Sequence, residues 1–138
     1  VIFSPFKVGR WLTVHWRENA GPDLVNIEWV KASRDSIYMK HFDGMYISPY
    51  YLRPETKQFL KWEKTLVTRG LWADDDPDMG GPFINYTFYD EETSRIYMID
   101  GFVYNPGKDK LHTLRSLEAI ARTFVSSSSK PKGNKGVK

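Results

Sequence analysis

Carboxylates at alternate positions make one acidic loop the first candidate for chemistry. The loop is Asp74-Asp-Asp-Pro-Asp78, and oxygen ligands spaced in this way can surround Ca²⁺. An EF-hand loop counted from Asp74 requires glycine at position six and glutamate at position twelve, but Met79 and Asn85 stand there. We therefore interpret the segment as a solvated hairpin loop, with metal binding by Asp74, Asp76 and Asp78 as the alternative.

Two glycines that follow this loop raise the question of a phosphate site. A phosphate loop needs a helix after it, because the amide groups at the start of the helix point at the phosphate. The residues after Gly80-Gly81 have strand character instead. We predict a turn in which the glycines supply positive φ angles, with Pro82 opening the next strand.

Asp100 is a second candidate, because a regular strand places it on an apolar face. The side chains that share this face are Ile96, Met98, Phe102 and Tyr104. A carboxylate that points inward requires a cation or hydrogen-bond donors. Arg69 on a neighbouring strand and Arg115 on the last predicted helix are the candidate partners.

The pattern favours a structural ion pair at Asp100 over a catalytic acid. Buried pairs often serve structure, and the sequence places no nucleophile or second carboxylate beside this residue. A bulge at Gly101 would turn Asp100 outward. The alternative is a hydrolase-like enzyme that uses Asp100 with an acid of the 74–78 loop.

Other catalytic and cofactor signatures are weak or missing in the sequence. His15, His41 and His112 are too far apart for a short-range metal motif. The chain has no nucleophile elbow, Walker loop, nicotinamide fingerprint or cysteine nucleophile. We therefore predict no cofactor, and we regard catalysis as the weaker class of function.

Aromatic residues offer a candidate binding surface. One face of an antiparallel sheet can expose several rings, and exposed aromatic clusters mark contact surfaces for proteins, peptides or glycans. The competing interpretation is that helices and a further N-terminal half cover them. The candidate residues are Tyr46, Tyr50, Tyr51, Trp62, Tyr86 and Tyr89.

Composition bounds the class of protein. The 138 residues fit one domain, and 15% aromatic with 41% hydrophobic residues indicate a folded chain. The net charge is +3, but residues 126–138 hold four lysines and no acid, so the rest is near −1. We predict a single domain over residues 1–125 and a disordered basic tail over 126–138. Because the excess positive charge lies in the tail, we consider nucleic-acid binding unlikely. The start at Val1 suggests an interior fragment or a processed product.

Several elements must position these residues. Residues 11–16 and 24–29 have strand patterns, and the turn residues between them suggest a hairpin. A short helix is expected over Ala32 to Phe42, capped by Ser33 or Ser36. Residues 45–51 suggest an edge strand because they contain a proline.

The second half of the chain gives the clearest pattern. Residues 54–64 are ambiguous, because Pro54 suits the first position of a helix while Leu60, Trp62, Lys64 and Leu66 also fit the period of two of a strand. We favour a short helical or irregular turn, followed by a strand from about Lys64 to Trp72. Residues 83–90 and 95–104 alternate and complete a three-stranded meander. A last helix carries an apolar stripe that should lie across one face of the sheet. The stripe consists of Leu111, Leu114, Leu117, Ala121 and Phe124.

Taken together, these motifs resemble a known family. Arg69-Gly-Leu-Trp72, Met79-Gly-Gly-Pro-Phe83, Gly101-Phe-Val-Tyr104 and the helix from Leu114 to Ile120 resemble the C-terminal half of the DUF4837 family. These are uncharacterised envelope lipoproteins of Bacteroidetes. The resemblance implies an exported protein of the periplasm or outer membrane, tethered through an upstream lipidated cysteine that is not in this chain. The family supplies no catalytic residues.

We expect an α+β domain with an antiparallel sheet of five to seven strands. The C-terminal amphipathic helix should pack on one face, and one further short helix should accompany it. The structural residues of this framework are expected to be Arg69, Trp72, Gly80, Gly81, Asp100, Gly101 and Arg115. The function that fits this reading is a non-catalytic binding or assembly module of the bacterial cell envelope, with a protein, peptide or glycan as partner.

Overall fold

One antiparallel sheet of six strands forms the centre of the molecule. The computed structural model describes residues 2–3, 9–41, 46–73, 80–104 and 110–125. The strand order is β1-β2-β6-β5-β4-β3. The strands are β1 (Ile2–Phe3), β2 (Gly9–Arg17), β3 (Tyr46–Phe59), β4 (Trp62–Ala73), β5 (Gly80–Asp90) and β6 (Arg95–Tyr104). The predicted α+β class and strand number are confirmed.

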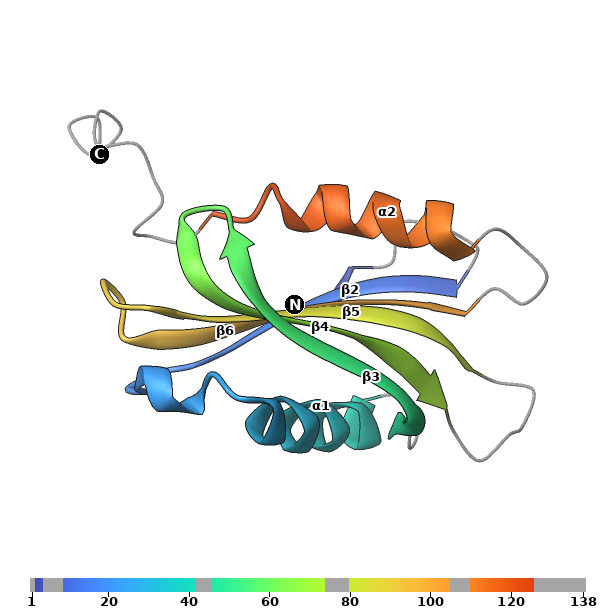
Figure 1. Ribbon diagram of the computed structural model, residues 1–138, viewed down its shortest axis with the longest axis horizontal. Helices are drawn as coiled ribbons and strands as arrows, with labels where there is room; N and C mark the ends of the chain where they lie inside the picture. The colour runs from blue at the N-terminus through green and yellow to red at the C-terminus, as the bar shows by residue number, and fades with distance from the viewer. Residues whose placement is uncertain (1, 4–8, 42–45, 74–79, 105–109, 126–138) are drawn as a thin grey trace.

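In the part of the chain that the structure describes, two α-helices cover opposite faces of this curled sheet (Figure 1). The first, α1 (Ile27–His41), follows a short 3-10 helix at Pro22–Leu24. The second, α2 (Lys110–Ala121), lies across the other face, as the apolar stripe predicted. The sheet is therefore buried on both sides.

The meander predicted for the second half of the chain is confirmed and is longer than expected. β4 pairs with β5, and β5 pairs with β6, in continuous register. β3 adds a fourth consecutive strand at the edge of the sheet, where the prolines at 49 and 54 are tolerated. The helical or irregular turn favoured over residues 54–64 is wrong, and the alternative of a strand is correct for most of this segment. β3 runs to Phe59, and a tight turn with Leu60 at φ 54° leads into β4.

The hairpin predicted between residues 11–16 and 24–29 is also wrong. β2 pairs with β6 instead, from Gly9 opposite Tyr104 to Arg17 opposite Ile96. Residues 27–29 begin α1, because the Asn26 side chain caps the helix by accepting the Trp29 amide at 2.8 Å. The helix thus starts earlier than the predicted Ala32, and its cap is Asn26 rather than Ser33 or Ser36.

The core on the α2 face is continuous and largely aromatic. Leu114, Leu117 and Ala121 of α2 are buried against the sheet. At the end near the hairpin tips, Trp62 stacks on Phe88 with ring centroids 4.2 Å apart, and Phe124 packs against both rings. This burial positions α2 on one face of the sheet, so that α1 packs on the other face.

Close approach of neighbouring backbone or side-chain atoms accounts for two of the glycines. Gly81 lies inside β5, where an added Cβ would meet the Val103 carbonyl oxygen at 1.8 Å. Its role is therefore close approach of the chain, not the turn we predicted. Gly101 lies beneath Leu117 of α2, and the continuous pairing of β6 shows that the suggested bulge is absent there.

Candidate functional site

A row of buried polar side chains crosses the sheet beneath α1. Thr13 of β2 lies opposite Asp100 of β6 in the strand register. Asp100 in turn lies opposite Asn85 of β5, and Asn85 lies opposite Thr68 of β4. All four side chains are fully buried. Four adjacent strands thus present polar groups in one line to the helix.

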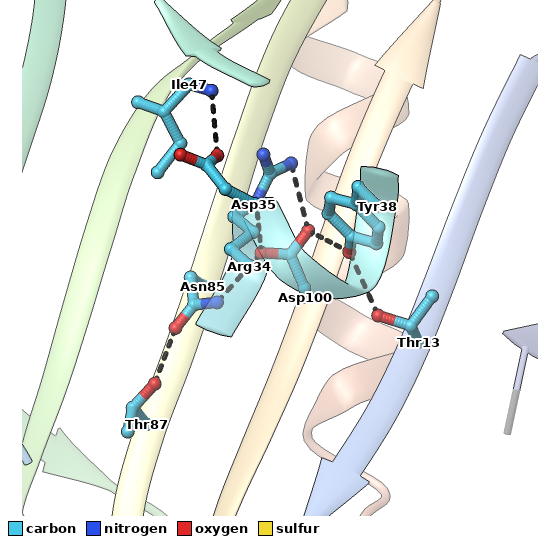
Figure 2. A network of polar contacts seen from close by, with 8 residues as sticks. All are labelled: Thr13, Arg34, Asp35, Tyr38, Ile47, Asn85, Thr87 and Asp100. Carbon is cyan, nitrogen blue, oxygen red and sulfur yellow. Dashed lines mark hydrogen bonds and ion pairs between the residues drawn. The ribbon is translucent and has the colours of Figure 1, made fainter. Parts of the chain in front are cut away.

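Asp100 accepts hydrogen bonds from four donors (Figure 2). Its Oδ2 accepts from Arg34 Nε and Asn85 Nδ2, each at 2.8 Å. Its Oδ1 accepts from the Tyr38 hydroxyl at 2.7 Å and from Arg34 Nη2 at 3.2 Å. A carboxylate offers about four lone-pair sites, so this one is saturated.

Arg34 supplies the positive charge of the cluster from the middle of α1. The side chain is fully buried, and its guanidinium carbon lies 3.9 Å from the centre of the Phe83 ring and 4.4 Å from that of Tyr38. Aromatic faces attract a cation in this position. Its Nη1 has no hydrogen-bond partner among the described residues. Arg34 is therefore held by one bidentate carboxylate and two rings.

Tyr38 links the carboxylate to β2. Because its hydroxyl proton is donated to Asp100, Thr13 Oγ1 acts as the donor to the Tyr38 oxygen at 3.0 Å. Burial raises the pKa of Tyr38 well above its usual value, and the negative charge of Asp100 raises it further. The phenol therefore stays protonated and serves as a hydrogen-bond donor. On the other side, Thr87 donates to Asn85 Oδ1 at 2.7 Å and orients that amide.

The partner of Asp100 differs from both residues that the sequence suggested. Arg69 points to the α2 face, where it pairs with Glu118 at 3.0 Å. Arg115 is exposed on α2. The face of Asp100 was predicted correctly, but its cation comes from α1, which packs on that face. Arg34 lay inside the helix predicted over Ala32 to Phe42, but no sequence pattern showed that this helix packs on the face of Asp100.

This arrangement is suited to holding α1 against the sheet rather than to acid–base catalysis. Asp100 has no exposed surface and no unused lone pair, so a substrate could reach it only if α1 moved. The acidic loop that was its suggested catalytic partner lies outside the described residues, as do Asp74, Asp76 and Asp78. The described geometry gives no support to the hydrolase-like alternative.

A cleft beside the buried cluster is a candidate binding site in the described structure. It lies between α1 and the end of β2 and has a volume of about 480 Å³. Cavities of this size accommodate small ligands or a few side chains. Met98 of β6 also lines the cleft, together with three consecutive β2 residues and five residues of α1. These are His15, Trp16, Arg17, Trp29, Ala32, Ser33, Ser36 and Ile37.

The cleft combines apolar walls with one cation, the Arg17 side chain. His15, Arg17 and Met98 share the sheet face of Thr13 and Asp100, because β2 and β6 pair without a shift in register. Trp29 and Ile37 bring apolar surface from α1. No carboxylate is among the lining residues.

The predicted aromatic surface is only partly present. Tyr46 and Tyr51 are exposed on β3, at 38% and 39%. Trp62 and Tyr86 are buried in the α2-face core, so they do not belong to an exposed surface. Tyr89 is half-buried and lines a second cavity of about 850 Å³ near the hairpin tips, and the Tyr50 side chain lies outside the described residues. The strand alternation alone could not show that two helices cover both faces.

Three other residues expected to be structural lie in the framework. Trp72 donates its indole N–H to the Val103 carbonyl at 2.9 Å and is buried on the α1 face. Gly80 begins β5 beside it. Arg69 and Tyr86 both contact Glu118 of α2, at 3.0 and 3.3 Å. These contacts tie the centre of the meander to α2.

Metal chemistry finds no support within the described ranges. No group of three His, Cys, Asp or Glu side chains in that part of the chain could hold an ion. His15 lines the cleft, and the side chains of His41 and His112 are not described. Among the helices that the structure describes, none has both the length and the apolar character to cross a bilayer.

Comparison with known proteins places the chain in a family. Searches of curated proteins and of solved structures gave no significant match. The model of DUF4837, described as a domain of unknown function, matches residues 7–123. That range includes the buried cluster, the cleft and both helices. The chain therefore belongs to the DUF4837 family.

Proposed function

We propose that this domain is a non-catalytic binding module of the bacterial cell envelope, and that the cleft between α1 and β2 is its binding site. The single observation that carries the proposal is this cleft of about 480 Å³, with apolar walls and the cationic side chain of Arg17 in its lining. The expected partner is a protein, a peptide or a glycan. The envelope location rests on the resemblance to envelope lipoproteins.

The buried cluster has a structural role and the cleft beside it is open, and this difference supports a binding role for the domain. The acid best placed for catalysis is saturated by four hydrogen bonds and is fully buried. The wall of the cleft nearest to Asp100 is α1, and the buried cluster holds this helix on the sheet through Arg34 and Tyr38. A site whose walls are held in place loses little conformational entropy on binding. The cluster thus preorganises the cleft.

Site-specific photo-crosslinking in the native envelope tests this function. A benzoylphenylalanine in place of Ser36, which is exposed and lines the cleft, should form an adduct with a protein, a peptide or a glycan-bearing partner. The same group in place of Arg115, exposed on α2 across the sheet, is the matched control. Mass spectrometry of the full-length protein identifies the adduct.

The outcome separates a binding cleft from a passive surface hollow. An adduct formed at position 36 and not at 115 supports the proposal. Ala32→Phe in the cleft should suppress this adduct, whereas Ala119→Phe, at an exposed alanine of α2, should not. Equal adducts at both positions, or none at position 36, would contradict the cleft as the binding site.

A further inference from the structure

The cleft lies on the face of the sheet, under one flank of α1. Its floor is formed by β2 and β6, where His15 pairs with Met98 in register. Its side is formed by α1, whose residues Ala32 and Ser36 are exposed and line the cleft. A strand beside β2 in the plane of the sheet would extend this floor without filling the space above it. A ligand would therefore enter over the face of the sheet, along the flank of α1.

The cleft has a charged outer end and an apolar inner end. α1 runs back along β2, because the helix follows the end of this strand and its residue Tyr38 reaches Thr13. Arg17, the last residue of β2, therefore lies at the outer end, and the buried Met98 lies further in beside His15. A molecule in the cleft thus meets one charge at the opening and apolar surface within.

The charge of Arg17 is available to a ligand. The side chain is exposed, and within the described ranges its guanidinium takes part in no ion pair or hydrogen bond. Glu18, the next residue, contacts Arg95 at 3.5 Å, and no carboxylate lines the cleft. Asp35 of α1 accepts the Ile47 amide instead. The cleft is therefore complementary to an anion.

Arg17 and Met98 are close enough for one residue of a ligand to contact both. They occupy diagonal positions on neighbouring strands, since Arg17 pairs with Ile96, and such neighbours lie about 7–8 Å apart. The length of an arginine side chain covers much of this distance. A carboxylate bound by Arg17 and an apolar group packed on Met98 and Ile37 can therefore belong to one residue. The C-terminal residue of a peptide carries both groups.

A chain end also brings fewer polar groups into the cleft than other ligands would. An internal segment would carry a peptide group on each side of its apolar residue, and the side chains of Ala32, Ile37 and Met98 offer these groups no hydrogen bonds. A glycan would bring hydroxyls to the same apolar surface. At a C-terminus the last carbonyl is part of the carboxylate, and the amide N–H can donate to the hydroxyl of Ser33, which lines the cleft.

Resting on the proposed function, we propose that the cleft binds the C-terminal residue of a polypeptide partner. The apolar side chain of this residue packs on Met98 beneath α1, and its terminal carboxylate pairs with Arg17. Capture of a terminal carboxylate is a recurring mode of peptide recognition. The rest of the partner chain leaves past Ala32 and Ser36, on the exposed flank of α1.

A random heptapeptide library displayed with free C-termini tests this specificity with the full chain as bait. Selected peptides should share an apolar last residue. Ala32→Phe, which fills the cleft, should weaken a selected synthetic peptide by about tenfold or more, and Ala119→Phe should leave its Kd unchanged. Arg17→Gln should weaken it by roughly two- to fivefold, as expected for a partly exposed ion pair, and Arg115→Gln should have no effect.

Amidation of the peptide C-terminus tests the carboxylate separately. The amidated peptide should bind the parent roughly two- to fivefold more weakly than the free acid does. Arg17→Gln should bind the two forms equally, and Arg17→Glu should prefer the amidated form. Two glycines added after the last residue displace the carboxylate from the apolar side chain and should weaken binding at least as much as amidation does.

Free 4-methylpentanoate separates a polypeptide end from a small organic acid. This probe has the side chain of leucine and a carboxylate but no peptide group, so it should bind at least about tenfold more weakly than a selected peptide. Equal affinity of the two would overturn the inference. A library without binders, peptides insensitive to Ala32→Phe, or the same effect of amidation in the parent and in Arg17→Gln would also overturn it.

Failure of this inference and failure of the proposed function can be told apart. If the Ser36 adduct is a glycan or an internal protein segment and amidation has no effect, the inference is wrong and the cleft binds a ligand of another class. If neither experiment shows dependence on Ala32→Phe, the binding function itself is wrong.

Discussion

Asp100 shows how one buried charge acquires a structural role. The residue lies on the sheet face where alternation predicted it, and there it receives four hydrogen bonds from α1 and β5. A buried ion pair adds little net stability over an apolar replacement, but breaking one leaves an uncompensated charge. We infer that the cluster specifies the position of α1, since Arg34 and Tyr38 find partners only in that position.

Removing the charge of Asp100 should be strongly destabilising. Asp100→Asn leaves the Arg34 guanidinium buried without a counter-ion and should lower the free energy of unfolding by roughly 3–5 kcal/mol. Urea unfolding at neutral pH measures this loss. Glu118→Gln, in the Arg69 pair whose members are 39% and 20% exposed, should cost at most about 1 kcal/mol. Equal losses in the two variants would contradict the structural role of Asp100.

Tyr38 should make stability depend on pH in the alkaline range. Its pKa in the folded state is raised by burial and by the charge of Asp100, so above pH 10 the unfolded chain releases a proton that the folded chain retains. The stabilising contribution of Tyr38 is complete below about pH 10. Above that pH, the free energy of unfolding should fall by about 1.4 kcal/mol per pH unit.

Comparison of urea unfolding curves between pH 8 and 11 tests this dependence. Tyr38→Phe should reduce stability at neutral pH by about 1.5–3 kcal/mol, because a hydrogen bond to a charged group is lost. It should also make the alkaline decline less steep than in the parent. Tyr86, whose pKa is raised by burial and by Glu118, should add a similar slope that Tyr86→Phe removes. An unchanged slope in Tyr38→Phe would show that its phenol ionises normally.

At the scale of elements, a cap outweighed strand propensity in the first third of the chain. Residues 24–29 alternate like a strand, yet Asn26 accepts the Trp29 amide and α1 begins at Ile27. The packing of Val30, Arg34 and Tyr38 on the sheet then stabilises the helix. Propensity is a weak prior when tertiary contacts favour another conformation.

Loss of this cap should weaken α1 measurably. Asn26→Ala leaves the Trp29 amide without its side-chain acceptor and should cost about 0.5–2 kcal/mol of unfolding free energy. Asn26→Asp retains an acceptor and places a negative charge at the helix start, so it should be neutral or stabilising. Thermal and urea unfolding compare the two variants. A similar loss in both would mean that the amide of Asn26, which donates to the Asp23 carbonyl, matters more than the cap.

At the scale of the whole molecule, the described residues form one sheet with a core on each face. Phe102 of β6 packs on the α1 side, and Val103 beside it packs on the α2 side. Neighbouring residues of the central strands thus belong to different cores. Because the strands cannot leave one core without leaving the other, we expect the two faces to unfold together.

Cavities made on either face should therefore lower the same transition. Leu117→Ala on the α2 side should cost about 2–5 kcal/mol, and Phe102→Leu on the α1 side should cost roughly 1–2 kcal/mol. Circular dichroism and tryptophan fluorescence should give coincident urea curves in both variants. Amide exchange that slows or quickens in only one helix would show that the two layers are independent.

Local patterns were sufficient for the later part of the fold. Side chains of the strands 83–90 and 95–104 alternate in character along the chain. A short turn joins the two strands, so they can pair by closing only a short loop. The stripe of Leu114, Leu117 and Ala121 likewise indicated a helix with one buried face. Division of the chain into a domain over 1–125 and a basic tail over 126–138 stays a prediction.

The candidate site was less predictable, because its parts come from distant segments. Thr13, Arg34 and Asp100 meet through the pairing of β2 with β6 and the packing of α1 over both. Arg69 on a neighbouring strand and Arg115 on the last helix were reasonable partners for Asp100, but both lie on the α2 side of the sheet. The cleft was not foreseen, since it exists only where α1 leaves the end of β2 uncovered.

The sequence by itself determined the class of fold, the meander, the last helix and the inward position of Asp100. Each of these follows from periodicity and turns within a short stretch of chain. Only the tertiary structure decided that Arg34 neutralises Asp100, that two of the six candidate aromatics are buried, and that a cleft opens beside α1. The physical reason is that long-range pairing and the choice of face depend on the total burial of the molecule, which no local pattern contains.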